Sequence, residues 1–279
     1  MTEPTSEPTV VTLADRDACA LAAAERIVEI LDVAIDTNGE AHWVTTGGSS
    51  APPIYRHLAM GPLRGELDWR KVNLWFTDER FVPIDHPKSN AKVALDDLVD
   101  ASAFSGESGT GESGMAVEVG RAPGVRLRRD NIHIIPVSEA IAESRDTSWA
   151  AARYAEEIRA EGPDENDDGL PAFDLILLGM GPDGHVLSVF PGSPAFDTDA
   201  WVVGVPAPTH VEPHLARVTL NPRLIGAAHE LLMVTTGDAK ASTLRDVLRG
   251  EIDPRQHPAQ LARRAGATWI VDRAAASLL

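Results

Sequence analysis

The sequence predicts an α/β fold with a mainly parallel sheet. Short apolar segments alternate along the chain with segments of helical periodicity, which is the pattern of βαβ units. The segment 173–181, FDLILLGMG, is the most apolar, as expected for a strand in the middle of a parallel sheet. No internal repeat or abrupt change of composition divides the 279 residues. We therefore predict one domain over residues 10–279, preceded by a flexible tail at residues 1–9.

The predicted elements follow one another in short steps. Apolar residues recur at helical spacing from about Leu13 to Ile35, which predicts a long amphipathic helix. Ser89 or Asn90 stands near the start of another helix as its cap. The Gly-, Ser- and Glu-rich composition of residues 103–124 predicts a mobile insertion. We expect strands at 41–46, 72–76, 131–137, 173–181, 201–205, 217–220, 230–236 and 267–272, and further helices at 51–60, 89–99, 147–161 and 239–248.

Composition and charge exclude several classes of protein. The formal net charge of −17 argues against nucleic-acid binding, which needs a basic face. No apolar run is long enough to span a bilayer, and the N-terminus does not look like a signal peptide. The lone cysteine, Cys19, cannot form an internal disulfide and suits a reducing cytoplasm. The sequence leaves the oligomeric state open, with a monomer preferred.

Three polar motifs each follow a predicted strand directly. They are TGGSS at 46–50, TDER at 77–80 and GMGPDGH at 179–185. In open parallel sheets, ligands bind beyond the carboxyl ends of the strands. We therefore expect the three motifs to converge on one pocket.

The segment GMGPDG fits the dinucleotide-binding pattern G-x-G-x-x-G letter for letter. That pattern requires a helix after the third glycine and an acidic residue at the end of the next strand. Here Pro191, Gly192 and Pro194 interrupt any helix, and Asp199 precedes the next strand instead of ending it. The context excludes a nicotinamide cofactor.

The same glycines suit a turn that carries chemistry. Glycine permits positive φ and a close approach of the backbone to a ligand. An Asp-Gly-His turn would place the carboxylate of Asp183 beside the imidazole of His185, as where an acid orients a histidine base. The alternative is a turn histidine without a chemical role.

The other motifs each allow two interpretations. TGGSS is either a phosphate-binding nest at a helix N-terminus or an ordinary turn. Asp78 and Arg80 point to the same side of an extended segment, either into a shared pocket or as a surface ion pair. Arg217 and Lys240 either complete an anion site or are solvated.

Two further kinds of site are disfavoured. His210 and His214 in HVEPH resemble a metal pair, but Pro213 forbids the regular helix that would align them. Ser49 and Ser50 lack the G-x-S-x-G elbow of an acyl-enzyme nucleophile. We expect no metal and no organic cofactor.

The motifs TGGSS, TDERFVP, SN, LLGMGPDGHVLSVFPGS, RVTL and TTGDAKA, in this order, resemble the 6-phosphogluconolactonase family from about Leu13 to Val271. The resemblance implies a Rossmann-like three-layer sandwich, as in sugar-phosphate isomerases and deaminases. It implies hydrolysis of 6-phosphoglucono-1,5-lactone in the pentose phosphate pathway, without a cofactor. Related deaminases carry a glutamate where this chain has Phe190, which favours the lactonase. A sugar-phosphate sensor without turnover would usually carry a DNA-binding module, and none is seen.

This reaction needs a base for water and groups that hold the substrate. We assign His185 as the general base and Asp183 as its orienting group, with Asp78 positioning the water or sugar hydroxyls. The resemblance implies that a set of cations and strand-end residues holds the phosphate and other polar substrate atoms. This set is Gly47, Gly48, Ser49, Arg80, Asn90, Gly181, Arg217 and Lys240.

Overall fold

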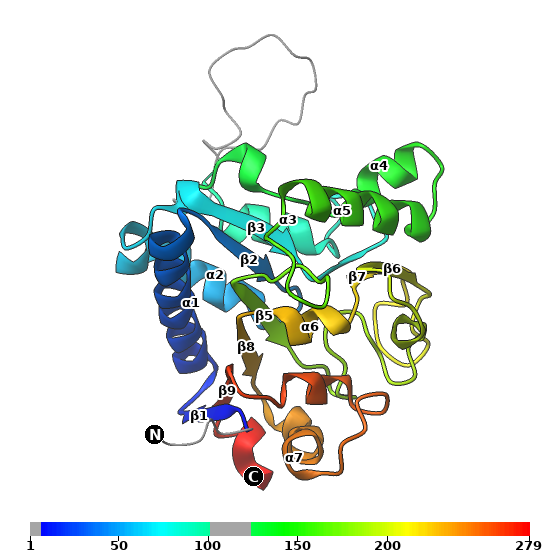
Figure 1. The fold of residues 1–279 in the computed structure, drawn as a ribbon. Coiled ribbons are helices and arrows are strands. Elements are labelled where there is room, and N and C mark those ends of the chain that lie inside the picture. The colour runs from blue at the N-terminus through cyan, green and yellow to red at the C-terminus, as the bar shows by residue number, and fades with distance from the viewer. Residues whose placement is uncertain (1–6, 101–123) are drawn as a thin grey trace.

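A six-stranded sheet with the order β1-β9-β8-β5-β2-β3 forms the centre of the molecule (Figure 1). The computed structural model describes residues 7–100 and 124–279. Every pairing in this sheet is parallel, which confirms the predicted α/β class. β5 lies inside the sheet between β8 and β2, as its apolar sequence predicted. The strands are β1 (Thr9–Leu13), β2 (Ala41–Thr45), β3 (Val72–Phe76), β5 (Leu175–Gly179), β8 (Glu230–Thr235) and β9 (Ala267–Asp272).

A second, three-stranded sheet is antiparallel and has the order β4-β7-β6. The chain passes from β3 into β4 through Thr77 alone, whose N–H donates to the carbonyl oxygen of Thr45 at 2.9 Å. In this sheet Arg80 is the register partner of Arg217. The sequence located β6 and β7 but did not separate them from the parallel sheet, and it gave residues 77–80 as a motif after a strand, where the structure has β4. They are β4 (Asp78–Arg80), β6 (Val202–Val205) and β7 (Arg217–Leu220).

Helices cover the sheets. The longest, α1 (Arg16–Asn38), starts where the Asp15 side chain accepts the N–H of Ala18 at 3.0 Å, and it ends at Gly39, whose φ is 91°. It packs across β2, β8 and β9, while α5 packs against β6 and β7. The others are α2 (Ala51–Met60), α3 (Asn90–Asp97), α4 (Val137–Ala142), α5 (Thr147–Glu161), α6 (Arg223–Ala227) and α7 (Ala241–Arg249).

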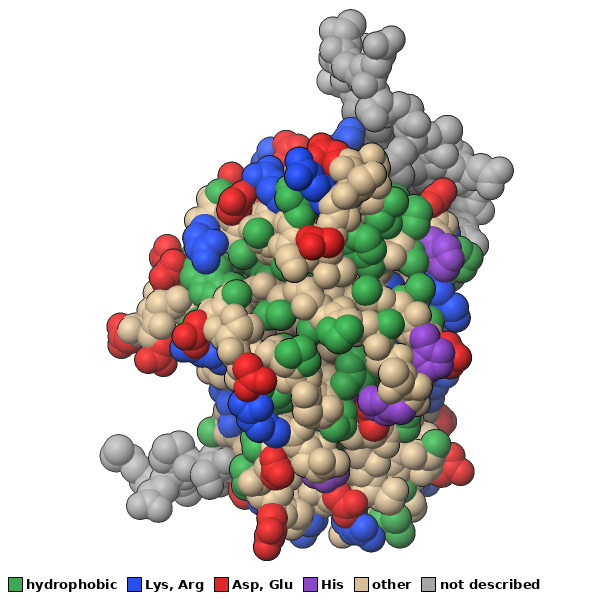
Figure 2. Space-filling model, turned by 90° about the vertical axis from the view of Figure 1, so that its right-hand side faces the viewer, with side chains coloured by type: hydrophobic (Ala, Val, Ile, Leu, Met, Phe, Trp, Pro, Cys, Tyr) green, Lys and Arg blue, Asp and Glu red, His purple; other side chains and the backbone are tan. Residues whose placement is uncertain are grey.

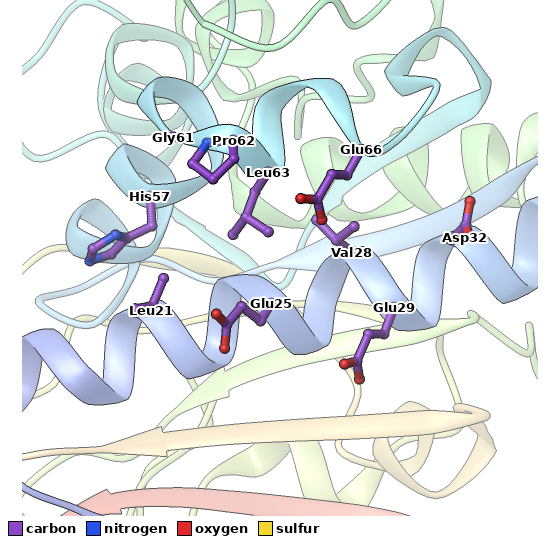
Figure 3. Close-up of a pocket in the computed structure, with 10 residues that line it drawn as sticks. All are labelled: Leu21, Glu25, Val28, Glu29, Asp32, His57, Gly61, Pro62, Leu63 and Glu66. Carbon is purple, nitrogen blue, oxygen red and sulfur yellow. The ribbon is translucent and has the colours of Figure 1, made fainter.

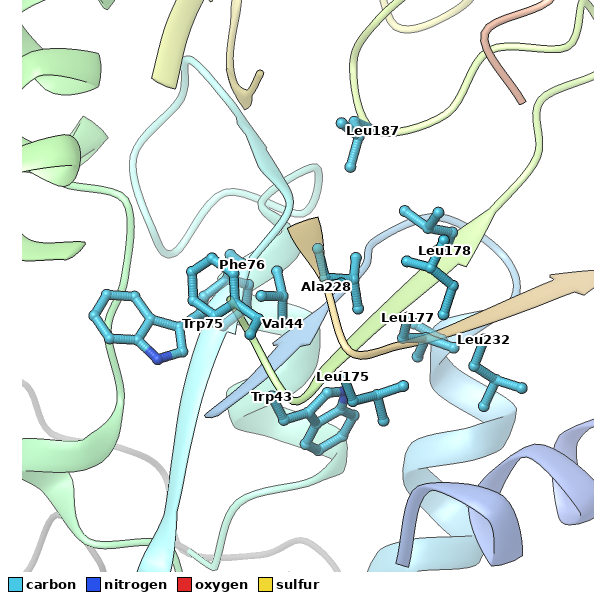
Figure 4. Packing of buried hydrophobic residues seen from close by; sticks show 14 of the residues in the cluster. Trp43, Val44, Trp75, Phe76, Leu175, Leu177, Leu178, Leu187, Ala228 and Leu232 are labelled. Atoms are coloured by element: carbon cyan, nitrogen blue, oxygen red, sulfur yellow. The ribbon is translucent and has the colours of Figure 1, made fainter. Parts of the chain in front are cut away.

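Large apolar side chains fill the core on both faces of the central strands (Figure 4). Every residue of β2 and β3 is buried, including Trp43 and Trp75. Leu175 and Leu177 of β5 lie in the same cluster. Because neighbouring residues of a strand point to opposite faces, burial along the whole strand means that both faces of the sheet are covered. The loops at the strand ends are therefore built on a rigid base.

One predicted strand and one predicted boundary differ from the structure. Residues 131–137 do not form a strand: a single bridge joins Ile132 to Leu74, and α4 begins at Val137. The predicted tail at residues 1–9 is wrong at its last residue, because β1 begins at Thr9 and pairs with β9; residues 1–6 lie outside the described residues. The predicted insertion at 103–124 lies outside the described residues except for residue 124.

The surface mixes charges of both signs. Figure 2 shows acidic and basic side chains interspersed over one face of the molecule. The chain has a formal charge of −17, but its acidic side chains do not form a single patch on this face. Among the described helices, none is both long and apolar enough to cross a membrane.

Candidate active site

The three predicted motifs meet in one cleft of ≈ 280 Å³ at the carboxyl ends of β2, β5 and β8. All the predicted site residues except Asp183 line it, and Asp183 lies directly behind His185. The position agrees with the rule for open parallel sheets. The lining residues named in the sequence analysis are Gly47, Gly48, Ser49, Asp78, Arg80, Asn90, Gly181, His185, Arg217 and Lys240.

A tight turn after β5 holds Asp183 and His185 together. Oδ1 of Asp183 lies 2.5 Å from Nδ1 of His185 and accepts the His185 backbone N–H at 3.2 Å. The N–H of Gly181 donates to the carbonyl oxygen of His185 at 2.9 Å, and Gly184 has a φ of 85°. Such a φ favours glycine. A carboxylate bound to one ring nitrogen fixes the imidazole and leaves Nε2 as the proton acceptor.

The carboxylate of Asp183 is bound on both oxygens. Oδ2 lies 2.9 Å from Nε2 of His210. Burial acts to raise the pKa of Asp183, but the hydrogen bonds and charge of His185 and His210 outweigh it, so the pKa lies well below its usual range. Asp183 is therefore an anion at neutral pH.

The two histidines of HVEPH do not face each other. His210 contacts Asp183, whereas Nδ1 of His214 lies 2.7 Å from the carbonyl oxygen of Pro208 and its Nε2 lies 3.1 Å from Glu212. Within residues 7–100 and 124–279, no group of three or more His, Cys, Asp or Glu side chains could hold a metal ion. The sequence analysis did not foresee the partner of His210.

Asp78 is buried in the wall of the cleft, with 5% of its surface exposed. One carboxylate oxygen accepts the hydroxyl of Ser188 at 2.6 Å, and the other accepts that of Thr77 at 2.9 Å. Ser188 follows Leu187, a cleft residue with a φ of 57°, which is uncommon outside glycine. Sequence reasoning gave Ser188 no role, although it is the serine of the G-x-D-G-H-x-x-S motif. It holds Asp78 in one orientation.

Arg80 and Arg217 bring two guanidinium groups to the cleft from neighbouring strands. Arg217 is 4% exposed and donates to the carbonyl oxygen of Pro213 at 2.9 Å, while Arg80 donates to that of Lys88 at 2.7 Å. Burial lowers the pKa of Arg217, and Asp78 opposes this effect. The Nε atoms of both arginines are buried without a partner in the described parts of the chain. Buried donors are normally satisfied, so an acceptor from a ligand suits this site.

Lys240 lines the cleft from the 3₁₀ turn before α7, and the turn Gly47–Ser49 lines the same cleft. Burial lowers the pKa of Lys240, and the nearby guanidinium of Arg16 lowers it further. Arg16 also donates to the carbonyl oxygen of Ser49. The turn precedes the first residue of α2, and Gly48 has a φ of 75°. Backbone N–H groups at a helix N-terminus attract anions.

Asn90 ties the first motif to the second. Its Nδ2 donates to the carbonyl oxygen of Asp78 at 2.9 Å. A Cβ on Gly47 would lie 1.9 Å from Oδ1 of Asn90, so a larger residue there would displace the Asn90 side chain. Buried Glu79, which sequence reasoning missed, accepts the N–H groups of Asn90 and Ala91 at 2.8 Å each. Burial raises the pKa of Glu79 in spite of these bonds.

Another pocket, of ≈ 510 Å³, lies between α1 and the segment around Pro62 (Figure 3). Glu25, Glu29, Asp32 and Glu66 line it, and none of its lining residues in the described parts of the chain is an arginine or lysine. An anionic ligand is repelled there. Arg223, which follows the RVTL motif, pairs with Asp199 and does not line the cleft.

Residues 14–270 match the model of a family described as glucosamine-6-phosphate isomerases/6-phosphogluconolactonase. A 6-phosphogluconolactonase of Streptomyces coelicolor is 32% identical over 273 residues, which cover 98% of this chain and 95% of that protein. A 6-phosphogluconolactonase of Mycobacterium tuberculosis is 30% identical over 267 residues, which cover 95% of this chain and 96% of the other.

Solved structures show the same fold. A 6-phosphogluconolactonase from Trypanosoma cruzi superposes with a TM-score of 0.80 at 23% identity and covers 99% of both chains. A monomeric glucosamine-6-phosphate deaminase gives a TM-score of 0.70 at 19% identity, covering 97% of this chain and 100% of that one. The family model matches residues 14–270, a range that includes all three motifs at the ends of the strands. The chain belongs to the glucosamine-6-phosphate isomerase/6-phosphogluconolactonase family.

Proposed function

We propose that this protein hydrolyses 6-phosphoglucono-1,5-lactone to 6-phosphogluconate in the pentose phosphate pathway. One observation carries the proposal: an oriented histidine shares a cleft with three cationic side chains. His185 is held by Asp183 at 2.5 Å, and Arg80, Arg217 and Lys240 line the same space. The names of the relatives and the membership of the family support the same reaction.

The mechanism begins with His185 as a general base. Its Nε2 takes a proton from water as the water oxygen bonds to the lactone carbonyl carbon. The negative charge of Asp183 stabilises the imidazolium that forms. When the tetrahedral intermediate collapses, the bond between this carbon and the ring oxygen breaks, and the imidazolium returns its proton to that oxygen. The products are a carboxylic acid, which ionises, and a free hydroxyl.

The cations hold the substrate while this happens. Arginine binds phosphate in a bidentate manner and lysine acts as a point charge. Lys240 and the turn Gly47–Ser49 line the cleft, and the unpartnered Nε atoms of Arg80 and Arg217 supply further donors. Asp78, fixed by Ser188 at 2.6 Å, accepts hydrogen bonds from the water or the sugar hydroxyls.

Phe190 separates this reaction from that of the deaminases. Its ring lies 4.6 Å from the His185 ring, between centroids. A phenyl ring at this position cannot transfer the proton that the glutamate of the deaminases handles in ring opening. Attack by water on a lactone needs no such second acid.

The deciding test is the disappearance of the phosphorylated lactone in a coupled assay, corrected for spontaneous hydrolysis. The expected result is a large acceleration that survives exhaustive chelation. No acceleration over the spontaneous rate contradicts the function, and release of ammonia from glucosamine-6-phosphate would assign the deaminase reaction instead. Loss on chelation that zinc restores would bring a metal back into the mechanism.

The proposal extends to the setting of the enzyme. We expect a monomer, because the described residues of one chain place His185 and the three cationic side chains in the same cleft. Buried Cys19, with its thiol pKa raised to about 11 mainly by burial, suits the cytoplasm. We expect neither nucleic acid nor a membrane as a partner. Light scattering at working concentration measures the mass directly.

A further inference from the structure

We propose that His210 is a positioning residue for the hydrolysis, acting through Asp183 on His185. The inference rests on the proposed function and adds to it a residue from outside the D-G-H turn. His210 lies in the segment between β6 and β7, 27 positions after Asp183 in the sequence. It does not line the cleft, so its effect must pass through another side chain.

The geometry makes Asp183 the carrier of this effect. Its Oδ1 serves His185 at 2.5 Å, and its Oδ2 serves His210 at 2.9 Å. With only the contact between Oδ1 and the His185 ring, the Asp183 carboxylate group could rotate about its Cβ–Cγ bond. That rotation would distort the hydrogen bond to His185. The second donor fixes the carboxylate plane, and with it the direction of the His185 ring. Hydrogen bonds to an ionised carboxylate are stronger than neutral ones.

A packing role is the competing explanation. The rings of His210 and Phe190 meet edge to face, with centroids 5.8 Å apart, and Phe190 also contacts His185. His210 could therefore support the site as an aromatic ring and not as a donor. The two roles make opposite demands on a replacement, because one needs an N–H group and the other a ring.

Several charged or titratable groups lie around the pair of Asp183 and His210. His185 and His210 flank the Asp183 carboxylate. The guanidinium of Arg217 lies 5.3 Å over the Phe190 ring, and Glu212 follows in the same segment as His210. Arg217 also bonds to Pro213 at 2.9 Å. That bond does not involve the side chain of His210, so we expect it to persist in His210 variants.

Two replacements separate the roles. His210→Gln keeps an N–H donor of similar reach, and His210→Phe keeps a ring without a donor. We expect His210→Phe to lower kcat by about five- to tenfold, the range for losing one hydrogen bond. Its KM should change by less than about twofold, because His210 does not line the cleft. His210→Gln should keep kcat within about threefold of the wild type.

The matched control is His214→Phe in the same segment. Its imidazole contacts Pro208 and Glu212 and not the catalytic turn, so kcat should stay near the wild-type value. The reverse order, with His210→Phe active and His210→Gln impaired, would assign a packing role and overturn the proposal. Equal losses in His210→Phe and His214→Phe would overturn it as well.

A double-mutant cycle tests the route through Asp183. In an Asp183→Ala background, adding His210→Phe should change kcat by less than about twofold, because the shared carboxylate is already gone. Losses that multiply would show that His210 acts independently of Asp183. Circular dichroism and melting curves confirm that each variant is folded.

A readout without turnover keeps this inference separate from the reaction. Long-range ¹H–¹⁵N spectra report the ring nitrogens of individual histidines. The His185 ring signals should move in His210→Phe, move little in His210→Gln and stay in place in His214→Phe. If the wild type failed to hydrolyse the lactone, the proposed function would fall while these spectra still decided the coupling. Unchanged His185 signals in His210→Phe would refute the coupling between His210 and His185.

Discussion

Gly181 lies against the imidazole of His185 so closely that a Cβ on residue 181 would come within 2.1 Å of two ring atoms. The same Cβ would lie 2.8 Å from Oδ1 of Asp183. Gly181 is the second glycine of the segment that fits G-x-G-x-x-G, and the absence of a side chain at this position leaves space for the His185 ring.

Gly181→Ala should displace His185 from Asp183 and lower kcat by about a hundredfold, the scale of losing a general base. The fold should persist, because the turn is at the end of β5 and not in the core. Steady-state kinetics and a melting curve measure both effects. Gly192→Ala is the control: a Cβ there meets no atom within 4 Å, although its φ of 70° adds some strain. Wild-type turnover in Gly181→Ala would show that the ring has another stable position.

His185→Ala should reduce kcat by about a hundredfold or more, since it removes the group that takes the proton from water. The measurement is initial rate after subtraction of spontaneous hydrolysis. His229, an exposed histidine far from the cleft lining, supplies the control variant His229→Ala. A folded His185→Ala enzyme with nearly full activity would reduce His185 to a turn residue.

Arg80→Ala and Lys240→Ala should each weaken kcat/KM for the phosphorylated lactone by about ten- to a hundredfold, as expected for a lost charge-assisted hydrogen bond. The lactone without phosphate should suffer much less. Inhibition by phosphate esters should weaken in parallel. Equal losses on both lactones would show that these side chains support the reacting centre or the fold and not the phosphate.

As the pH rises, binding of 6-phosphogluconate should begin to weaken at a lower pH than it would if Lys240 were an exposed lysine. Burial and Arg16 lower the pKa of Lys240, so the ammonium loses its proton, and the site a positive charge, below the usual lysine value of about 10.4. Calorimetric titrations from neutral to alkaline pH measure this. Lys240→Arg retains the charge and should flatten the profile. A wild-type profile as flat as that of Lys240→Arg would speak against Lys240 as a phosphate ligand.

Local patterns predicted the elements whose signals lie within the segment itself. The helix Ala51–Met60 and the strands Val72–Phe76 and Ala267–Asp272 have the predicted bounds. β1 was missed because its exposed Val10 and Val11 lie at the sheet edge, where no buried face marks the strand. The strand predicted at residues 131–137 was wrong, because an apolar run in the sequence does not reveal whether a neighbouring strand has a free edge with which it could pair.

The candidate site was predictable where a motif follows a strand. The rule that strand ends converge brought TGGSS, TDER and the D-G-H turn together, as the cleft shows. The partners of these motifs were not predictable, because they come from distant positions. Ser188 reaches Asp78 across 110 positions and His210 reaches Asp183 across 27. Such contacts follow from tertiary packing, which no local pattern encodes. The roles assigned to these side chains stay predictions.

The pairing of β1 with β9 has a consequence for synthesis on the ribosome. β1 lies beside β9 (Figure 1), with Thr9 opposite Thr268, so β1 cannot pair until β9 has been synthesised. β9 also joins β1 to β8, the strand that precedes Lys240. Pairing between such distant segments is slow, because a long loop must close before any contact forms. The edge of β8 that pairs with β9 therefore stays unpaired on the nascent chain until β9 has left the ribosome.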